Sequence, residues 1–476
     1  MEYKELLTSL KNKLNLEKSF DIQCRTIVAA GSKISFFSVA GLIDNDLAEE
    51  LIEHIAHGGE NAIFTLPCHD VTISQDVGDL TDSVLSGRGV ILCDKIRGGV
   101  VADIKKFPLR GISEPESDRV LRGPRDGFTE SLVFNTAMIR RRLRDPNLII
   151  ERFTVGESAK TDLALCYVKN CADEKFVSKM KEKLSNLNVK ALNMTQESLA
   201  EAIIHRGWYN PFPKVRYTER PDAAAAMLEE GSVIIVCDNT PQAMILPTSI
   251  FDYLQETDDF YLPPLVGTYL RLTRMAIFLL SLILTPLWYY CVKNVSDLPS
   301  WLHFIDIDKK AAVPLLMQLL LAEFMIDGLK LASLNTPNML NNSLSVVGGL
   351  ILGDYAVEAG WFSPQTILYM AIVAIASFTQ QSYELGYAFK FIRMLLLLAV
   401  ELFGGWGFIG GIILTVIAIA SNKTVSGSRS YLYPLIPFNK DALCRMFFRK
   451  RLKYGKTKKK CGAASCNCGS DNDACS

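Results

Sequence analysis

The sequence predicts an α/β soluble head of two related subdomains followed by an α-helical transmembrane bundle. Three observations support this prediction: soluble patterning over residues 1–265, two repeats within that part, and few charges between residues 275 and 422. Residues 275–292, 359–383 and 402–422 contain no charged residue. Runs of about 18 or more uncharged, mostly apolar residues can cross a hydrocarbon core of roughly 30 Å. We therefore predict an integral membrane protein with a large soluble head.

Composition excludes two classes of protein. The chain has 51 Lys and Arg residues and 51 Asp and Glu residues, and 49 % of its residues are hydrophobic. This balance is typical of neither nucleic-acid binding nor disorder. Residues 1–17 are rich in Lys and Glu and lack the apolar segment of a cleavable signal peptide. Cys93 and Cys237 fall within expected buried strands, which favours reduced thiols in a cytosolic head.

A first pair of matching segments in the head is offset by 129 residues. Residues 36–44 align with residues 165–173, and each segment is an apolar run, a turn and an Asp suited to cap a helix. An amphipathic helix is expected after each one, because apolar residues recur at i, i+4 and i+8. In these helices Leu47, Leu51 and Ile55 match Phe176, Met180 and Leu184.

A second pair of segments is offset by 144 residues, in the same order along the chain. Residues 87–94 align with residues 231–238, and in both a Gly that ends a short helix precedes a buried strand. A further strand is expected after each, such as residues 99–104 and 242–246. The sequence therefore predicts an internal duplication, with subdomains at residues 1–150 and 151–264.

An arginine-rich connector lies between the two halves. Seven arginines occur within residues 119–144, and a helix is expected over residues 129–144, ending before Pro146. One interpretation is an anion or lipid-headgroup site, because guanidinium groups bind phosphate and carboxylate in a bidentate manner. The other is salt bridging to acidic residues such as Asp126 and Glu130, in the head or in a neighbouring subunit. The candidates, which include two arginines of a similar later motif, are Arg122, Arg125, Arg140, Arg141, Arg142, Arg216 and Arg220.

The sequence contains no recognisable motif for catalysis, a cofactor or a metal. It lacks the phosphate loop GxxxxGK[ST], the nucleophile elbow GxSxG and the zinc motif HExxH. The five histidines have no ligand spacing, and His54 with His57 favours an exposed helix face. We therefore expect a protein that is not an enzyme and that needs no cofactor or metal.

Four spans are expected in the helical domain, which covers residues 265–422. Their predicted bounds are 265–292, with Pro286 near the outer end, 311–334, 341–358 and 364–384. The stretch that follows, up to Ser421, is too long for one helix and is interrupted by Gly404-Gly405 and Gly410-Gly411. We predict a glycine-hinged hairpin there, forming either two crossings or a re-entrant pair.

Basic residues flank the helical domain on both sides. Arg271 and Arg274 precede the first span, and nine Lys or Arg residues lie between Arg445 and Lys460. The positive-inside rule therefore predicts a cytosolic head, a cytosolic tail at residues 423–476, and an even number of crossings. The aromatic residues 431–438 suit a membrane interface, and the basic run can bind anionic lipids at about 1 kcal/mol per charge. The tail also holds Cys461, Cys466, Cys468 and Cys475, which are interpreted as a disordered thiol-bearing segment or a metal site.

Ionisable residues within the expected spans are candidate functional residues, because a charge is costly inside a membrane. Glu323, Asp327 and Lys330 share one face of the second span, at i, i+4 and i+7. They are interpreted either as a helix contact in which Asp327 pairs with Lys330, or as the wall of a wet ion path. Asp354 and Glu358 are expected at an outer mouth, where carboxylates attract cations.

The third span is rich in small residues. Gly349 and Gly353 have the GxxxG spacing that allows two helices to approach closely. Helix packing is one explanation, and a pore-lining helix is the alternative. In the second case the constriction would be formed by Ser343, Val346, Val347 and Leu350.

Several motifs resemble the GerA family of bacterial spore germination proteins. They include residues 122–130 (Arg-Gly-Pro-Arg-Asp-Gly-Phe-Thr-Glu), 160–162 (Lys-Thr-Asp), 217–222 (Tyr-Thr-Glu-Arg-Pro-Asp), 321–324 (Leu-Ala-Glu-Phe) and 431–438 (Tyr-Leu-Tyr-Pro-Leu-Ile-Pro-Phe). The resemblance covers about residues 15–450. Residues 286–288, 382–385 and 447–449 look most similar to a sporulation branch of the family, the alternative being the A subunits of germinant receptors.

This resemblance implies a protein of the spore inner membrane that acts in germination. It also implies assembly like that of the family's A subunits, which form homo-oligomers, as pentamers, that act as a cation channel and open when germinants are sensed. The sporulation branch is associated with release of ions and dipicolinate. Expected partners are membrane lipids, other copies of the chain and other spore germination membrane proteins, with no nucleic acid. The alternative function is a non-conducting scaffold that docks such proteins.

Overall fold

The computed structural model describes most of the chain. The described residues are 3–29, 31–58, 61–68, 70–107, 120–204, 210–307, 311–335, 351–380, 382–422, 424–425 and 431–449. The chain forms two units. The head comprises Met1–Arg206 and Lys214–Thr248, and the helical unit comprises Gly207–Pro213 and Ser249–Arg451.

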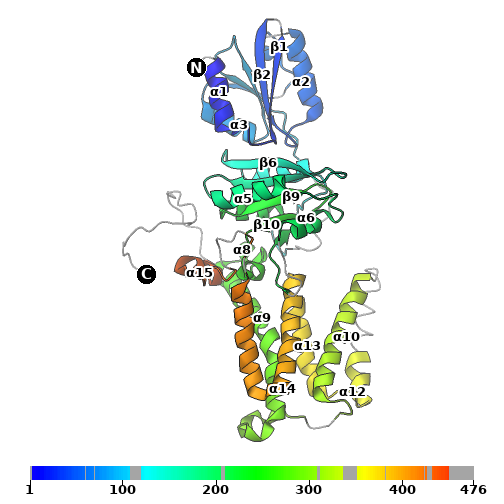
Figure 1. Cartoon of the computed structure of the whole chain (residues 1–476). Coiled ribbons are helices and arrows are strands. Elements are labelled where there is room, and N and C mark those ends of the chain that lie inside the picture. The colour runs from blue at the N-terminus through cyan, green and yellow to red at the C-terminus, as the bar shows by residue number, and fades with distance from the viewer. Residues whose placement is uncertain are drawn as a thin grey trace, which may run out of the picture. The chain divides into compact units, whose positions relative to one another are not determined.

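The first half of the head, subdomain 1, is an antiparallel sheet with helices on both faces (Figure 1). Its strands are in the order β1-β2-β4-β5-β3. Its elements are α1 Tyr3–Lys13, β1 Ile22–Ala29, β2 Ser32–Val39, α2 Asn45–Gly58, η1 Asn61–Thr65, β3 Val71–Ser74, α3 Val77–Leu85, β4 Gly89–Cys93 and β5 Gly99–Ala102.

The core of subdomain 1 has two layers, one on each face of the sheet. Side chains of successive residues along β2 point to opposite faces and so enter different layers. Phe37 packs in one cluster with Leu10 of α1 and Leu80 of α3. Phe36 on the opposite face packs in a cluster with Leu51 of α2. The sheet is thus covered by α1 and α3 on one face and by α2 on the other.

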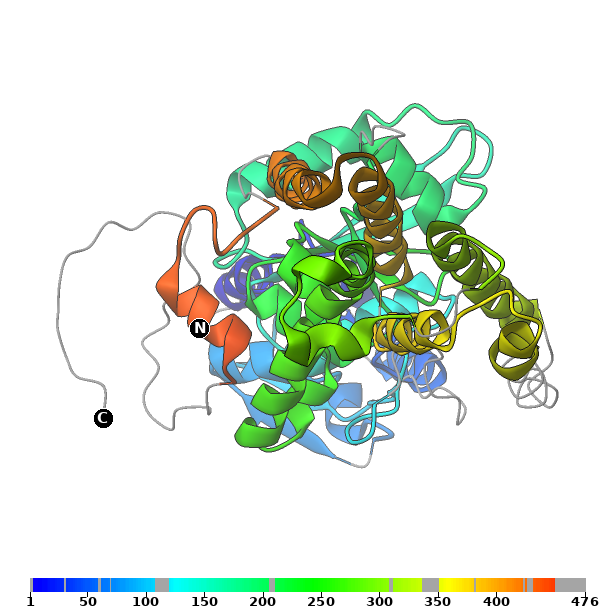
Figure 2. The same ribbon diagram turned by 90° about the horizontal axis from the view of Figure 1, so that it is seen from below.

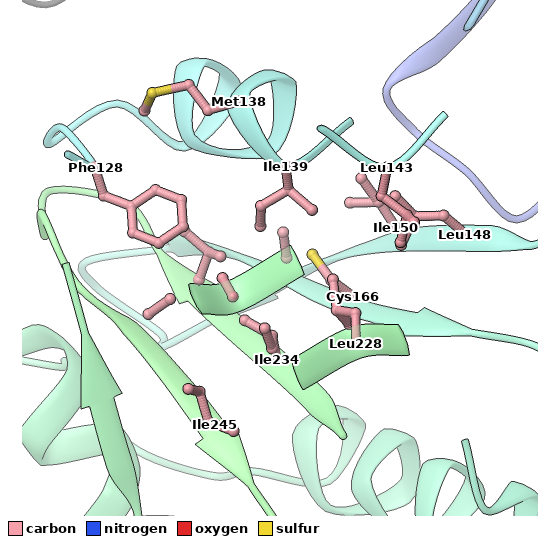
Figure 3. Packing of buried hydrophobic residues seen from close by; sticks show 14 of the residues in the cluster. Phe128, Met138, Ile139, Leu143, Leu148, Ile150, Cys166, Leu228, Ile234 and Ile245 are labelled. Atoms are coloured by element: carbon pink, nitrogen blue, oxygen red, sulfur yellow. The ribbon is translucent and has the colours of Figure 1, made fainter. Parts of the chain in front are cut away.

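Subdomain 2 repeats this architecture. Its sheet has the equivalent strand order, β6-β7-β9-β10-β8, and is also antiparallel. Its elements are α4 Leu132–Arg142, β6 Leu148–Val155, β7 Thr161–Val168, α5 Glu174–Ser185, α6 Thr195–Ile203, β8 Arg216–Thr218, α7 Pro221–Glu229, β9 Val233–Cys237 and β10 Ala243–Leu246. Figure 3 shows its core, in which Met138 and Ile139 of α4 lie over the sheet that carries Ile234 and Ile245.

The strand register agrees with the duplication expected from the sequence. Ile34 pairs with Cys93 in the first sheet, and Leu163 pairs with Cys237 in the second. These pairs are related by the same offsets, 129 and 144 residues, as the repeated segments. The head therefore consists of two antiparallel sheets with helices, built on one plan.

Several details of the head differ from the expectation. The sequence did not indicate β1, β3, β6 and β8, and β6 crosses the expected boundary at residue 150. Leu47 is 36 % exposed, because the face of α2 that enters the core carries Ala48, Leu51 and Ile55. The connector helix α4 is shorter than residues 129–144. Its bounds are those of α1 shifted by 129 residues, so it is the first helix of the second copy.

The helical unit contains four long or medium helices among its described residues, together with short turns. The elements are η2 Ile250–Leu254, α8 Asp258–Tyr261, α9 Pro264–Lys293, η3 Val295–Asp297, η4 Ser300–Ile305, α10 Leu315–Asn335, the π-helical turn η5 Ile351–Tyr355, α12 Ala356–Glu358, α13 Pro364–Phe378, α14 Tyr383–Ser421 and α15 Lys440–Phe447. In the described part, α9 and α14 are long and apolar enough to cross a membrane, and α13 is a shorter apolar helix.

Helix α14 reverses direction at Gly404. This residue has φ 59° and ψ −137°, a backbone conformation outside the helical region. Gly411 lies so near the preceding half that a Cβ atom on it would be 2.4 Å from Cδ2 of Leu396. The two halves therefore lie side by side (Figure 2). The second glycine pair, Gly410-Gly411, stays helical, so only the first pair forms the hinge.

The other predicted spans differ in their ends. The fourth helix, α13, ends at Phe378 rather than at residue 384. The first span, α9, keeps Pro286 inside a continuous helix. Most of the third span lies outside the described residues, and only its end is seen as η5 and α12.

Candidate functional site

Five ionisable side chains come from two helices of the helical unit. Glu323, Asp327 and Lys330 lie on one face of α10, because residues four and three apart are neighbours on a helix surface. Lys390 and Arg393 are similarly placed on the first half of α14. The two groups face each other, and we call Glu323, Asp327, Lys390 and Arg393 the ion-pair network.

The pair of Glu323 and Arg393 is the most buried part of the network. Nε of Arg393 donates to Oε1 of Glu323 at 2.6 Å. An η-nitrogen of Arg393 donates to the carbonyl oxygen of Ser281 on α9 at 2.8 Å. The two residues are only 2 % and 4 % exposed. One guanidinium thus joins three helices.

Lys390 binds the other carboxylate. It forms an ion pair with Asp327, and it also donates to the backbone carbonyl of Glu323 at 3.1 Å. Its Nζ lies 3.7 Å from Oε2 of Glu323. Both carboxylates on α10 are therefore neutralised by α14.

Lys330 has a different environment from the one expected. Its ammonium lies over the rings of Phe378 and Tyr387, 5.3 and 5.8 Å from their centroids. Among the ion pairs of the described residues, the partner of Asp327 is Lys390, not Lys330. Of the two interpretations of this helix face, the one in which Asp327 pairs with Lys330 thus differs from the described ion pair, and Lys330 makes cation–π contacts instead.

A small cavity of about 30 Å³ adjoins the network. A polar cavity of this size has room for water. Its lining includes the three α10 charges, Lys390 and Arg393, and hydroxyls or amides from three other segments. These polar neighbours are Ser281, Ser377, Gln380 and Ser382.

Pairing decides whether such charges are tolerated. A carboxylate or guanidinium removed from water costs several kcal/mol, which only a close opposite charge and further hydrogen bonds offset. Removing one partner of a buried pair typically costs about 3–5 kcal/mol, because an uncompensated charge is left behind. The ion pairs therefore depend on the packing of α10 against α14, because separating these helices would leave buried charges without their partners.

Lys390 and Arg393 were missed as site residues by sequence reasoning. They follow the predicted fourth span, which ends at residue 384, and basic residues are common at the inner end of a span. The structure instead places them within α14, after a new helix start capped by Ser382. Two basic residues spaced i, i+3 inside an otherwise apolar stretch share one helix face, as the acidic pair on α10 does at i, i+4, and this signal could have identified them.

The other expected pore residues are not part of this cluster. Asp354 on η5 and Glu358 on α12 are exposed and do not line the cavity. Ser343, Val346, Val347 and Leu350 lie outside the described residues.

Ion pairs join three of the head arginines to acidic residues of the head. Arg140 is fully buried and donates to Asp21 from Nε at 2.8 Å, and to the carbonyl of Leu148 at 3.0 Å. Because Asp21 immediately precedes β1, this pair joins the two subdomains. Two further pairs, Arg142 with Asp126 at 2.5 Å and Arg220 with Asp222 at 2.7 Å, brace the connector and α7.

The remaining head arginines are distributed over different surroundings. Arg141 lies over the ring of Phe107 at 4.3 Å, and Arg216 is half-buried on β8. Arg122 and Arg125 are exposed beside Pro124. The structure therefore does not bring the seven arginines together into one anion site.

Comparison with known proteins connects nearly the whole chain to one family. The family model described as "Bacillus/Clostridium GerA spore germination protein" matches residues 8–461. Stage V sporulation protein AF of Bacillus subtilis is 35 % identical over 92 % of this chain and 90 % of its own length. Spore germination protein KA of the same organism is 30 % identical over 86 % of this chain and 77 % of its own.

A third relative adds a description of location. The uncharacterized membrane protein YfkQ of Bacillus subtilis is 30 % identical over 85 % of this chain and 78 % of its own length. The resemblance expected from the motifs is thereby confirmed, including the similarity to the sporulation branch. The protein belongs to the GerA family of spore germination proteins.

Proposed function

We propose that this protein is an integral membrane protein of the spore inner membrane and a subunit of an oligomeric cation channel. The ion-pair network is the gate of that channel. When germinants are sensed, the gate opens and promotes release of ions and dipicolinate. The head and tail face the cytosol, where they contact lipids and other spore germination membrane proteins.

One observation carries the proposal: a closed network of four charges lies between apolar helices beside a polar cavity. Ionisable residues inside membrane segments generally face a protein interior or a water-filled path and mark ion pathways. In the described conformation both carboxylates are neutralised, so a cation would find no free ligand there. Conduction therefore requires α10 and α14 to separate, which makes the network a gate.

Membrane insertion is supported by independent features. Two described helices have the length and composition of membrane spans. A relative that covers most of the chain is named a membrane protein. Large apolar side chains such as Leu402, Trp406 and Leu414 are highly exposed on α14, as expected for a surface that contacts lipid.

Potassium efflux from liposomes that contain the full chain tests the gate. Glu323→Gln leaves Arg393 without its carboxylate, so basal efflux is expected to rise several-fold over the wild type. Glu401→Gln is the matched control, because Glu401 is another paired carboxylate of the helical unit, lies on α14, is bound by Tyr289 and Lys293, and does not line the cavity. Equal permeability of empty liposomes, wild type and both variants, with folded oligomers present, would exclude the channel.

The completeness of the pairing favours a second candidate, a non-conducting scaffold for germination proteins. In that case the network is a purely structural contact. Glu323→Gln would then lower the stability of the helical unit or its binding to partners, while ion permeability stayed at the level of protein-free liposomes.

A further inference from the structure

One segment of the head is held at both ends by the helical unit. The chain leaves the helical unit after Pro213, forms β8, α7, β9 and β10 of the head, and re-enters the helical unit at Ser249. The segment Lys214–Thr248 is therefore joined covalently to the helical unit at both of its ends.

Tyr431 contacts both connections. Its side chain is completely buried. Its hydroxyl donates to the carbonyl oxygen of Pro213 at 2.8 Å. Its own carbonyl accepts from the backbone N–H of Ile250 at 3.0 Å. A single residue from beyond α14 thus fixes the exit and the return of the segment.

A row of aromatic rings runs from this point to the membrane helices. Tyr431 packs edge-on against Phe212 with centroids 6.2 Å apart, and Phe212 packs against Phe389 of α14 at 6.1 Å. Phe389 in turn contacts Phe278 of α9 at 4.1 Å. Flat, rigid rings in close contact transmit a displacement with little loss, because protein interiors are close-packed and resist compression.

The row ends beside the ion-pair network. Phe389 directly precedes Lys390 and lies four residues before Arg393 on the same helix. Phe278 accepts a hydrogen bond from the hydroxyl of Ser281, whose carbonyl binds Arg393. The last two rings therefore lie on α14, which carries Lys390 and Arg393, and on α9, whose Ser281 carbonyl binds Arg393.

We propose that Tyr431 is the positioning residue through which movement of the head segment Lys214–Thr248 opens or closes the ion-pair network. This inference rests on the proposed function and adds to it the route of regulation. Displacement of the segment shifts Tyr431 and Phe212, rotates or slides α14 through Phe389, and separates Lys390 and Arg393 from α10. Coupling of this kind requires a packed element with two arrangements that both sites influence.

The first experiment measures access to the cavity in the full chain in lipid nanodiscs. Ser377→Cys, at the cavity wall, is modified with a small charged thiol reagent, and the chain without this substitution corrects for the natural cysteines. Tyr431→Phe removes only the hydroxyl that binds Pro213, and we expect it to change the modification rate at least three-fold. Tyr369→Phe is the control, since Tyr369 stacks on Trp288 at 4.4 Å in another aromatic pair.

Hydrogen exchange of the same samples shows whether the effect follows the proposed route. Tyr431→Phe should speed exchange at Ile250 and in the part of α14 around Phe389, with an unchanged melting temperature. Should Tyr431→Phe not fold, Phe212→Leu tests the same row. An unchanged rate at Ser377→Cys in the folded variant, or an equal change with Tyr369→Phe, would overturn the proposal.

A flux measurement separates this inference from the proposed channel. In liposomes, Tyr431→Phe alone should alter basal potassium efflux. In the double variant with Glu323→Gln it should have no added effect, because the network is already broken there. Absence of efflux from every sample would reject the channel alone, because cavity access and hydrogen exchange still decide whether Tyr431 controls the network.

Discussion

The guanidinium of Arg393 and the carboxylate of Glu323 meet at 2.6 Å in the interior of the helical unit, 70 residues apart in the chain. Neither side chain has appreciable contact with solvent. The pair joins α10 to α14, and the bond from Arg393 to Ser281 extends the connection to α9. The stability of the helix packing and the proposed gate consequently depend on the same contact.

Breaking this pair should destabilise the helical unit strongly. Glu323→Leu or Arg393→Leu leaves an opposite charge buried without its partner, and each is expected to cost about 3–5 kcal/mol. The double substitution should cost less than the sum of the two single ones, because no lone charge remains. Denaturant unfolding of the full chain in detergent, followed by tryptophan fluorescence of the helical unit, measures these costs. Strict additivity would contradict a direct interaction.

Gly404 should be far less tolerant of substitution than Gly410. A Cβ atom on either residue would meet no other atom within 4 Å, so the two positions differ in backbone conformation rather than in space. Gly404→Ala places a side chain at φ 59° and ψ −137° and is expected to cost about 1–3 kcal/mol. Gly410→Ala lies in a helix and should be neutral or stabilising by up to about 1 kcal/mol. Thermal unfolding in detergent compares them, and equal effects would argue against the hairpin.

Arg140 should be essential to the junction of the two subdomains, whereas Arg122 should not. Arg140→Leu leaves Asp21 buried without its partner, for an expected loss of about 3–5 kcal/mol. Arg122→Ala changes an exposed side chain and should stay within about 0.5 kcal/mol of the wild type. Hydrogen exchange of β1 and β6 in the full chain reports the opening of this junction. Similar protection in both variants would show that the buried pair contributes little.

Asp162 should make part of the head's stability depend on pH. The Arg152 guanidinium beside it, with a hydrogen bond from Thr154, holds the pKa of this carboxyl below its ordinary value of 3.8. A carboxyl with a lowered pKa stabilises the folded state above its ordinary pKa, and this contribution is lost as the pH falls through the lowered value. The advantage of the wild type over Asp162→Asn should therefore shrink as the pH drops below about 4.

Acid unfolding of both proteins, followed by circular dichroism, tests this dependence. Because the Arg152 side chain is half-exposed, added salt should reduce the difference between the two proteins. A difference that stays constant from neutral pH to pH 2 would mean that the ion pair does not contribute.

Local patterns in the sequence predict much of the head. The paired segments locate β2, β4, β7 and β9 because these central strands are buried on both faces and give continuous apolar runs. Edge strands such as β3 and β8 gave no signal, since they are short and partly exposed. The sequence suggested a connector rather than a core helix at α4, because three consecutive arginines interrupt the pattern of apolar residues that enter the core.

The site was predictable only in part. Glu323 and Asp327 are visible as charges in an apolar stretch, and their spacing places them on one face of a helix. Their partners depend on how α14 packs against α10, a long-range contact that periodicity does not encode. Tyr431 gave no signal as a contact to Pro213, since the two residues are 218 positions apart.

The two matching sheets also bear on the ancestry of the chain. A helix and two strands that recur at fixed offsets, with one strand order, point to duplication of an ancestral gene segment. Only the second copy sends its chain into the helical unit before its edge strand, whereas the first copy reaches β3 within the head through η1. In the described part of the chain, the link to the helices before the edge strand therefore belongs to the second copy alone.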